Sequence, residues 1–201
     1  LFSGSDNEQQ GSSDAGQIYK TTNMGLVGRL NYDYASKYLL EASFRYDGSS
    51  KFAKGHRWGF FPSVSAGYRI SEENFIKDTD ALSFLTNWKI RASYGVLGDD
   101  GSSSYQFLSG YDYPGAGYVF GTEAYKGLGF RGLPNPSITW YTSKTLNVGT
   151  DLDLFNGLFS FQIDFFWRYR DGLLGKRNQE VPGTIGAEMP EENLNQDLYK
   201  G

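Results

Sequence analysis

The chain has 201 residues, a formal net charge of −4, 17% aromatic residues, 26 glycines and no cysteine. The excess of acidic over basic residues argues against nucleic acid as a partner, and the absence of cysteine excludes disulfide scaffolds and thiolate metal sites. No segment approaches eighteen consecutive apolar residues, which excludes a transmembrane helix.

The first 23 residues show no strand pattern. They are rich in Gly, Ser, Asp and Gln, and they lack the basic region and the apolar run of a signal peptide. We expect residues 1–23 to be an extracellular loop or the end of a strand, and the chain to be an internal piece of a longer protein.

Six segments follow in which apolar and polar residues alternate with a period of two. In chain order they are residues 24–34, 38–46, 58–70, 88–96, 138–154 and 159–170. Successive side chains of a strand point to opposite faces, so each segment predicts a strand with one apolar and one polar face. The last segment is the strongest, because nearly all of its apolar positions are aromatic.

Charged residues in these segments gather on the polar side. We expect ten of them to line an aqueous lumen: Arg29, Asp33, Glu41, Arg45, Arg69, Arg91, Asp151, Asp153, Asp164 and Arg168. Some residues break the alternation. Leu39 and Phe61 are apolar on the polar side, and Lys144 is charged on the apolar side.

The length of the segments favours a membrane-spanning β-barrel. A spanning strand needs about 9 to 11 residues and alternates lipid-facing with lumen-facing side chains. The alternative is a soluble β-sandwich, such as a carbohydrate-binding module, whose core takes the apolar faces. Strands of globular proteins cluster near five or six residues, which weighs against that alternative. The predicted fold is therefore all-β, with antiparallel up-and-down strands that form part of a larger barrel, because six strands cannot close one.

Connections between the segments alternate between short and long. Residues 35–37 and 156–157 are tight turns, and residues 71–86 form a connection of medium length that can hold short helical turns. The opposite ends of the segments lead into longer stretches at residues 48–57 and 98–137. In outer-membrane barrels the short turns face the periplasm and the long loops face outside. We expect residues 171–201 to be another extracellular loop.

Two long runs of sequence carry a family resemblance. The first contains GRLNYDYASKYLLEASFRYDGSSKFAKGHRWGFFPSVSAGYRISEENF and LSFLTNWKIRASYGVLGDD. The second contains LPNPSITWYTSKTLNVGTDLDLFNGLFSFQIDFFWRYRDGLL, VPGTIG and ENLNQDLYKG. Both runs resemble the barrel of the SusC/RagA family of TonB-dependent outer-membrane transporters, and the resemblance covers nearly everything after residue 23.

The resemblance implies a location in the outer membrane and a barrel of about 22 strands around an N-terminal plug. It also implies a SusD-like surface lipoprotein as partner, and import of glycans or peptides with energy from TonB. The plug and the TonB-binding segment would lie outside this chain. One departure from the family pattern is the sequence Thr139-Trp140-Tyr141, where members often carry a Trp-Glu pair.

Candidate catalytic and metal-binding groups are few. His56 is the only histidine, so neither a metal cluster nor a Ser/His/Asp triad can be drawn from it. Asp99 and Asp100 lack the spacing of a calcium-binding loop and predict a turn. Asp151 and Asp153 share one strand face and are interpreted as lumen charges. We expect no enzymatic activity, no metal and no cofactor.

The stretch 98–137 is rich in aromatic residues. Its run YDYPGAGYVFG lacks the Lys-Ser/Thr ending of a phosphate-binding loop. Rings in a wet loop can stack on sugars or peptide side chains or pack on a partner protein, although they can equally pack among neighbouring loops. Six are candidates for contact with substrate or lipoprotein: Tyr105, Phe107, Tyr111, Tyr113, Tyr118 and Phe120.

Overall fold

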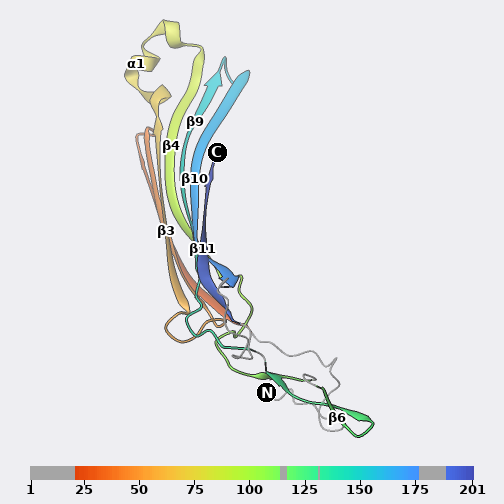
Figure 1. Ribbon diagram of the computed structural model, residues 1–201. Helices are drawn as coiled ribbons and strands as arrows, with labels where there is room; N and C mark the ends of the chain where they lie inside the picture. Colours follow the sequence, from red (N-terminus) through yellow and green to blue (C-terminus); the bar gives the residue numbers. More distant parts are fainter. Residues whose placement is uncertain (1–20, 114–116, 131, 177–188) are drawn as a thin grey trace.

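The computed structural model describes residues 21–113, 117–130, 132–176 and 189–201. These residues form one long curved sheet from which an extended loop region projects at one end (Figure 1). The sheet has seven strands in the order β1-β2-β3-β4-β9-β10-β11. Each strand pairs antiparallel with its neighbours in the sheet. The predicted all-β, antiparallel up-and-down arrangement is confirmed.

The strands are as long as the sequence pattern indicates or longer. The shortest has 10 residues and the longest 18, which meets the length of about 9 to 11 residues required to span a bilayer. Their bounds are β1 (Asn23–Tyr34), β2 (Tyr38–Ser49), β3 (Trp58–Arg69), β4 (Leu85–Asp99), β9 (Tyr141–Leu154), β10 (Phe159–Lys176) and β11 (Glu191–Lys200).

The C-terminal stretch contains a strand where a loop was expected over residues 171–201. Strand β10 continues to Lys176, and β11 pairs with it from Trp167↔Lys200 to Lys176↔Glu191. The sequence of β11, EENLNQDLYK, is too polar to show the alternation of the other strands, so its pairing with β10 decides its conformation. Residues 177–188 and 1–20, for which loops were also expected, lie outside the described residues.

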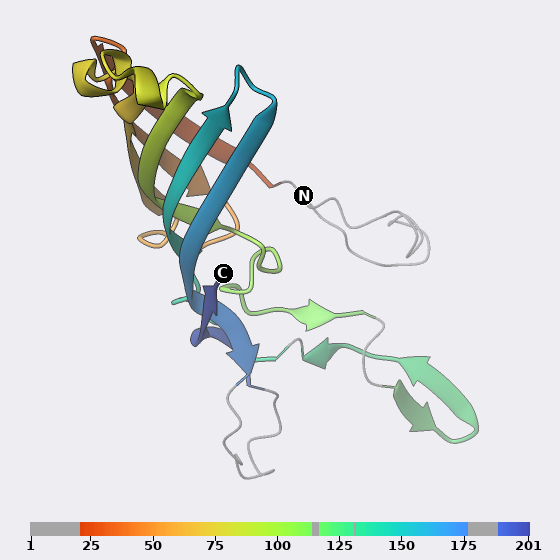
Figure 2. The ribbon, with the colours of Figure 1, turned by 90° about the horizontal axis from the view of Figure 1, so that it is seen from above.

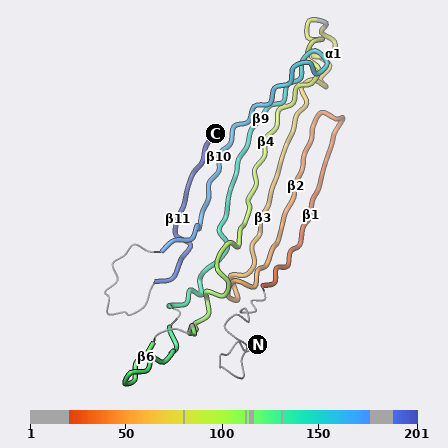
Figure 3. Tube along the Cα trace, turned by 90° about the vertical axis from the view of Figure 1, so that its right-hand side faces the viewer, coloured from red at the N-terminus to blue at the C-terminus, as the bar shows by residue number. Residues whose placement is uncertain are grey.

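The ends of the strands differ in the size of their connections (Figure 3). At one end, β1 turns into β2 through Ala35 and Ser36, both with positive φ. At the same end, β3 leads to β4 through the 3-10 helix η1 (Ile70–Glu72), the helix α1 (Asn74–Lys77) and the 3-10 helix η2 (Asp80–Leu82). The long connections lie at the other end. The expected alternation of short and long connections is thus confirmed, including the helical turns.

The sheet has an apolar face and a polar face. The apolar face is exposed along its whole length, for example at Leu30 (70%) and Phe165 (58%). A sandwich would bury such a face against a second sheet about 10 Å away, but the described residues form no sheet that covers it. The described residues therefore do not have the fold of a β-sandwich.

A small buried core lies where β3 and β4 separate, at the long-loop end. Pairing of β3 with β4 stops at Ser63↔Gly95, whereas β4 stays paired with β9 as far as Asp99. The ring of Phe61 fills the opening, and a Cβ added at Gly98 would overlap it. Phe61, Phe52 and Ile138 are all nearly inaccessible to solvent. Phe61 thus breaks the alternation because it seals the gap between two strands.

The long connection between β4 and β9 carries two small two-stranded sheets that project away from the seven-stranded sheet (Figure 2). One pairs β5 (Tyr111–Asp112) with β8 (Gly129–Phe130), and the other is a hairpin of β6 (Gly117–Phe120) and β7 (Glu123–Lys126). Among the described residues, no helix has the length and apolar character needed to cross a membrane.

Candidate functional site

The register places all ten charged residues predicted to line a lumen on the polar face of the sheet. In one row across the sheet, Arg69 lies opposite Lys89, which in turn lies opposite Asp151. That this face lines an aqueous lumen stays a prediction. The residues are Arg29, Asp33, Glu41, Arg45, Arg69, Arg91, Asp151, Asp153, Asp164 and Arg168.

The guanidinium of Arg91 joins three strands at the centre of the polar face. Its Nε lies 3.2 Å from Oδ1 of Asp151 on β9, and its Nη2 lies 2.7 Å from Oδ2 of Asp164 on β10. Gly149 lies between these side chains, and a Cβ there would come within 2.5 Å of Asp164 Oδ1 and 3.1 Å of Arg91 Cζ. The missing side chain at residue 149 therefore allows one arginine to reach across two strand spacings.

Other charges on the polar face have local partners. Arg29 Nη2 lies 3.2 Å from Glu41 Oε1, and Arg45 Nε lies 3.0 Å from Asp47 Oδ2. Asp33 accepts a hydrogen bond from the backbone N–H of Ser36 in the first turn. Because most of these charges are neutralised nearby, the face has a balanced, hydrogen-bonding surface without a strong field of one sign.

Two further residues predicted to line the lumen have neutral partners. Asp153 accepts a hydrogen bond of 3.0 Å from Asn87 Nδ2, and Arg168 Nε donates one of 3.3 Å to Thr145 Oγ1. The residues that the structure describes contain no group of three or more His, Asp or Glu side chains placed to hold a metal ion. His56 lies in the β2–β3 loop, where its carbonyl accepts a hydrogen bond from Thr139.

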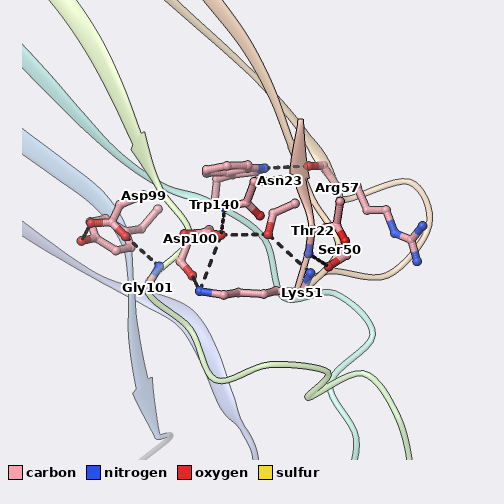
Figure 4. Close-up of polar contacts among 11 residues, drawn as sticks. Thr22, Asn23, Ser50, Lys51, Arg57, Asp99, Asp100, Gly101 and Trp140 are labelled. Carbon is pink, nitrogen blue, oxygen red and sulfur yellow. Dashed lines mark hydrogen bonds and ion pairs between the residues drawn. The ribbon is translucent and has the colours of Figure 1, made fainter. Parts of the chain in front are cut away.

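A polar bridge ties the end of β4 to the ends of β1 and β2 at the long-loop end (Figure 4). Asp100 Oδ2 accepts a hydrogen bond of 2.8 Å from Ser49 Oγ and lies 3.6 Å from Lys51 Nζ. Lys51 Nζ also donates to the carbonyl of Asp100, and Asn23 Nδ2 lies 3.4 Å from Asp100 Oδ2. These contacts fix the first residues of the long connection against the β1–β2 hairpin.

Trp140 lies beside this bridge. The alternation predicted over residues 138–154 gives it the same side as Leu146, Val148 and Leu152, which is the apolar side, but the structure does not place it there. Strand β9 begins at Tyr141, and the indole Nε1 donates a hydrogen bond of 3.0 Å to the carbonyl of Arg57 (Figure 4). The indole ring packs on Phe52 and Phe61, with centroid separations of 5.5 and 5.3 Å. Trp140 therefore extends the core that closes the gap between β3 and β4.

A hollow of about 480 Å³ opens on the polar face next to Trp140. This volume falls in the range of small-molecule sites, about 300 to 1,000 Å³. Glycines leave room between β1 and the end of β4. The groups around it can hydrogen-bond a polar ligand, and Trp140 adds an aromatic surface. The side chains that border it include Asn23, Arg45, Asp47, Asp99, Asp100 and Trp140.

Asparagine side chains fix the segment that leads into β9. Asn135 Nδ2 donates a hydrogen bond of 2.6 Å to the carbonyl of Glu191 at the start of β11. Asn193 Oδ1 accepts from the backbone N–H of Thr139, and its Nδ2 donates to the carbonyls of Thr139 and Gly172. The segment is thus held against both β10 and β11, so the root of the long connection is fixed to the sheet.

The six aromatic residues singled out in the long connection fall into two groups. Tyr105 and Phe107 are half-buried, and their ring centroids are 6.1 Å apart. The other four are exposed, with exposed fractions from 48% to 69%. The rings of Phe120 and Tyr125 meet edge to face on the β6–β7 hairpin. The structure does not bring the six together into one patch; the four exposed ones are Tyr111, Tyr113, Tyr118 and Phe120.

Sequence reasoning missed the residues that build the long-loop end of the sheet. Phe61 on the polar side of its segment was a signal, as was Gly59 two residues earlier, where an added Cβ would overlap the same ring. The asparagines and Asp100 gave no comparable signal, because their side chains bond groups that lie far away in the sequence. Such contacts depend on the tertiary fold and cannot be read from local periodicity.

The sequence matches the model of a protein family described as TonB dependent receptor-like, beta-barrel, over residues 2–196. The chain belongs to this family. The predicted resemblance is therefore confirmed, and the sheet is a segment of a TonB-dependent receptor barrel. Because the family consists of transporters, the prediction that the chain is not an enzyme is also confirmed.

Two relatives illustrate the match. A TonB-dependent receptor of Formosa agariphila is 34% identical over 184 residues, which cover 92% of this chain and 18% of the relative. The TonB-dependent receptor SusC of Bacteroides thetaiotaomicron is 35% identical over 175 residues, which cover 85% of this chain and 17% of SusC. The chain thus spans less than one fifth of the length of these relatives.

Solved structures show the same fold. The RagAB peptide importer in its closed-closed state matches 96% of this chain and 21% of the importer chain, with a TM-score of 0.74 and 20% sequence identity. The open-open state of the same importer matches 94% of this chain with a TM-score of 0.71 and 21% identity. At this identity the match describes the fold of the barrel wall alone.

Proposed function

We propose that this chain forms part of the barrel wall of a TonB-dependent importer in the outer membrane. The observation that carries the proposal is the two-faced sheet, which has an exposed aromatic and aliphatic face and an opposite face of paired charges. Lipid and water are the two media that such faces fit. Membership of the TonB-dependent receptor family supports the same conclusion.

The partners follow from the relatives. SusC and the RagAB importer are the relevant comparisons, and by this likeness the complete protein works with a SusD-like surface lipoprotein. TonB would supply the energy through a region that lies outside this chain. The imported solute is an oligosaccharide or a peptide. RagAB is a peptide importer, but the long-loop end of this chain offers hydrogen-bonding and aromatic groups suited to either solute.

Two features of the long-loop end are the proposed contact sites. The hollow beside Trp140 combines an aromatic ring with the guanidinium of Arg45 and the carboxylate of Asp99, groups that hydrogen-bond sugar hydroxyls and peptide amides alike. The projecting β6–β7 hairpin exposes Tyr118 and Phe120. An isolated two-stranded hairpin is marginally stable in water, so cover by a partner such as the lipoprotein would stabilise it.

The first test concerns location. The complete protein that contains this chain is expressed in a Gram-negative host, and membranes are floated with and without detergent extraction. We expect the protein to float with the outer-membrane fraction and to become soluble only in detergent. Recovery of a folded monomer from the aqueous fraction would contradict the proposal.

A second test concerns the hairpin. Replacing Tyr118, Phe120 and Tyr125 together by serine removes the exposed rings without touching the sheet. We expect reduced co-purification of the surface lipoprotein with an unchanged amount of barrel in the membrane. Phe75→Ser is the matched control, because Phe75 is 61% exposed at the opposite end of the wall. Equal co-purification of both variants would remove the hairpin from the contact surface.

A further inference from the structure

A shallow groove lies on the apolar face, close to the short-turn end of the sheet. Its volume is about 460 Å³, and its lining is almost entirely apolar. It extends across the sheet from β1 to β4. The outward-pointing side chains that line it are Tyr32, Tyr38, Leu40, Ala66, Tyr68, Ile90 and Ala92.

Two alanines form the floor of the groove. Ala66 and Ala92 are direct cross-strand partners on β3 and β4. The neighbouring row toward the short turns holds Tyr68 opposite Ile90, and the neighbouring row toward the long loops holds a valine opposite Tyr94. The small pair between two rows of larger side chains leaves a depression that apolar side chains border on both sides.

Hydrogen bonds hold one wall of the groove in place. The rings of Tyr38 and Tyr68 are stacked, with centroids 5.1 Å apart and an interplanar angle of 11°. Their hydroxyls donate to Oε1 of Glu73, at 3.5 and 3.0 Å. Glu73 Oε2 in turn lies 3.1 Å from Nζ of Lys37 in the first turn. The groove is therefore preformed, which lowers the entropic cost of binding.

Charges of both signs lie at the end of the groove. Lys37 in the first turn pairs with Glu73 in the connection between β3 and β4. In that connection, Lys77 Nζ lies 2.6 Å from Glu72 Oε2. Lys77 keeps a side-chain exposed fraction of 54%. Two ammonium groups beside two carboxylates complement a headgroup that itself carries a phosphate and an amine. A headgroup that carries a phosphate and no amine would offer the two carboxylates no cation of its own.

We propose that this groove is a binding site for a zwitterionic phospholipid, such as phosphatidylethanolamine. One acyl chain lies over Ala66 and Ala92, and the headgroup meets the charges of the connection between β3 and β4. The proposal rests on the proposed function, since it requires the apolar face to lie in a bilayer. With the short turns toward the periplasm, the lipid comes from the periplasmic leaflet.

The test uses the complete transporter, purified in detergent, delipidated and incubated with phosphatidylethanolamine in mixed micelles. Native mass spectrometry counts the lipids that remain bound after washing. The double variant Ala66→Leu with Ala92→Leu fills the groove with side chains that a lipid-facing position tolerates well. Ala42→Leu is the matched control, because Ala42 lies on the same face of β2 but does not line the groove.

We expect the wild type and Ala42→Leu to retain one phosphatidylethanolamine. The double variant should retain about tenfold less, because its leucines displace the acyl chain from the groove and a tenfold loss of affinity corresponds to losing the burial of roughly two methylene groups. Equal retention in all three proteins would overturn the site. Equal retention of phosphatidylglycerol, which lacks the amine, would overturn the headgroup assignment. A dimer mass that disappears in the double variant would assign the groove to a second copy of the chain and overturn the lipid.

The proposed function and this inference can fail separately. Uptake of the transported solute by cells that carry the wild-type protein reports on the importer. Membrane-embedded protein that imports its solute but retains no lipid in the groove would overturn the lipid site alone. A complete protein that does not enter membranes would overturn both.

Discussion

Phe61 occupies a position that strand alternation assigns to a polar side chain. The exposed fraction of Phe61 is 5%. Phe60, which directly precedes it and points to the opposite face, is 59% exposed. The difference follows from the separation of β3 and β4, which leaves a gap that only a large ring from the polar face can fill. Backbone pairing between β3 and β4 ends at Ser63↔Gly95. Beyond that pair, the packed rings of Phe61 and Trp140 hold the two strands together in place of backbone hydrogen bonds.

Phe61→Ala is expected to destabilise the complete barrel by about 3 to 5 kcal/mol, the usual cost of truncating a buried phenylalanine. The measurement is the temperature at which the protein in detergent loses its compact electrophoretic mobility. Phe60→Ala serves as the control and should lower that temperature far less, because detergent covers its site in both proteins. Similar losses in the two variants would show that the gap is not sealed by Phe61.

The sequence predicted the face of each charged wall residue but not its partner. Period-two alternation is local, so it places Arg91, Asp151 and Asp164 on the polar face. The ion pairs of Arg91 span 60 and 73 positions of sequence. They depend on the register between strands, which is set by turns and by close approaches such as that at Gly149. Local patterns carry no information on those distances.

At the scale of elements, the connection between β3 and β4 joins three parts of the short-turn end. Glu73 precedes α1, receives hydrogen bonds from Tyr38 on β2 and Tyr68 on β3, and pairs with Lys37 in the first turn. The hydrogen bond from Lys37 is the main cause that lowers the pKa of Glu73 below its ordinary value of 4.5, and the bond from Tyr68 adds to it. Ionised Glu73 therefore stabilises the folded state.

This linkage predicts a pH dependence with a definite sign. Because the pKa is lower in the folded state, the stabilisation is complete above about pH 4.5 and is lost as the pH falls through the folded value. Glu73→Gln should lower the thermal transition of the complete barrel at pH 7, and its difference from wild type should shrink as the pH falls below 4.5. Glu72→Gln, which removes a more exposed ion pair, should change the transition little. A pH-independent difference for Glu73→Gln would contradict the linkage.

Strand β11 shows what element-level prediction lacks. Its sequence contains only two leucines among mostly polar residues, and it was expected to be a loop. The neighbouring strand β10 supplies the missing information through nine paired positions, with a bulge near Gly172. Strands β1 to β4, β9 and β10 alternate strongly between apolar and polar residues, and the sequence alone located them.

The whole molecule is a sheet whose two faces demand opposite environments. Strands β1 and β11 each pair on one side only within the described residues, so their outer edges present unpaired backbone groups. The apolar face is exposed in the same residues. The sheet therefore makes physical sense as part of a closed barrel in a bilayer, in agreement with its family.

A pair of arginine substitutions on adjacent residues of β2 tests this assignment of faces. Ala42 points outward and lies opposite Val64, whereas Ser43 points to the polar face and lies opposite Ser63. If the apolar face meets lipid, Ala42→Arg should cost about 2 to 4 kcal/mol near the bilayer midplane, and an arginine on the lumen side should cost much less. The stability of the complete barrel refolded into lipid vesicles measures both. An equal cost for the two substitutions would mean that both faces are buried in protein, and a larger cost for Ser43→Arg would reverse the assignment of lipid and lumen.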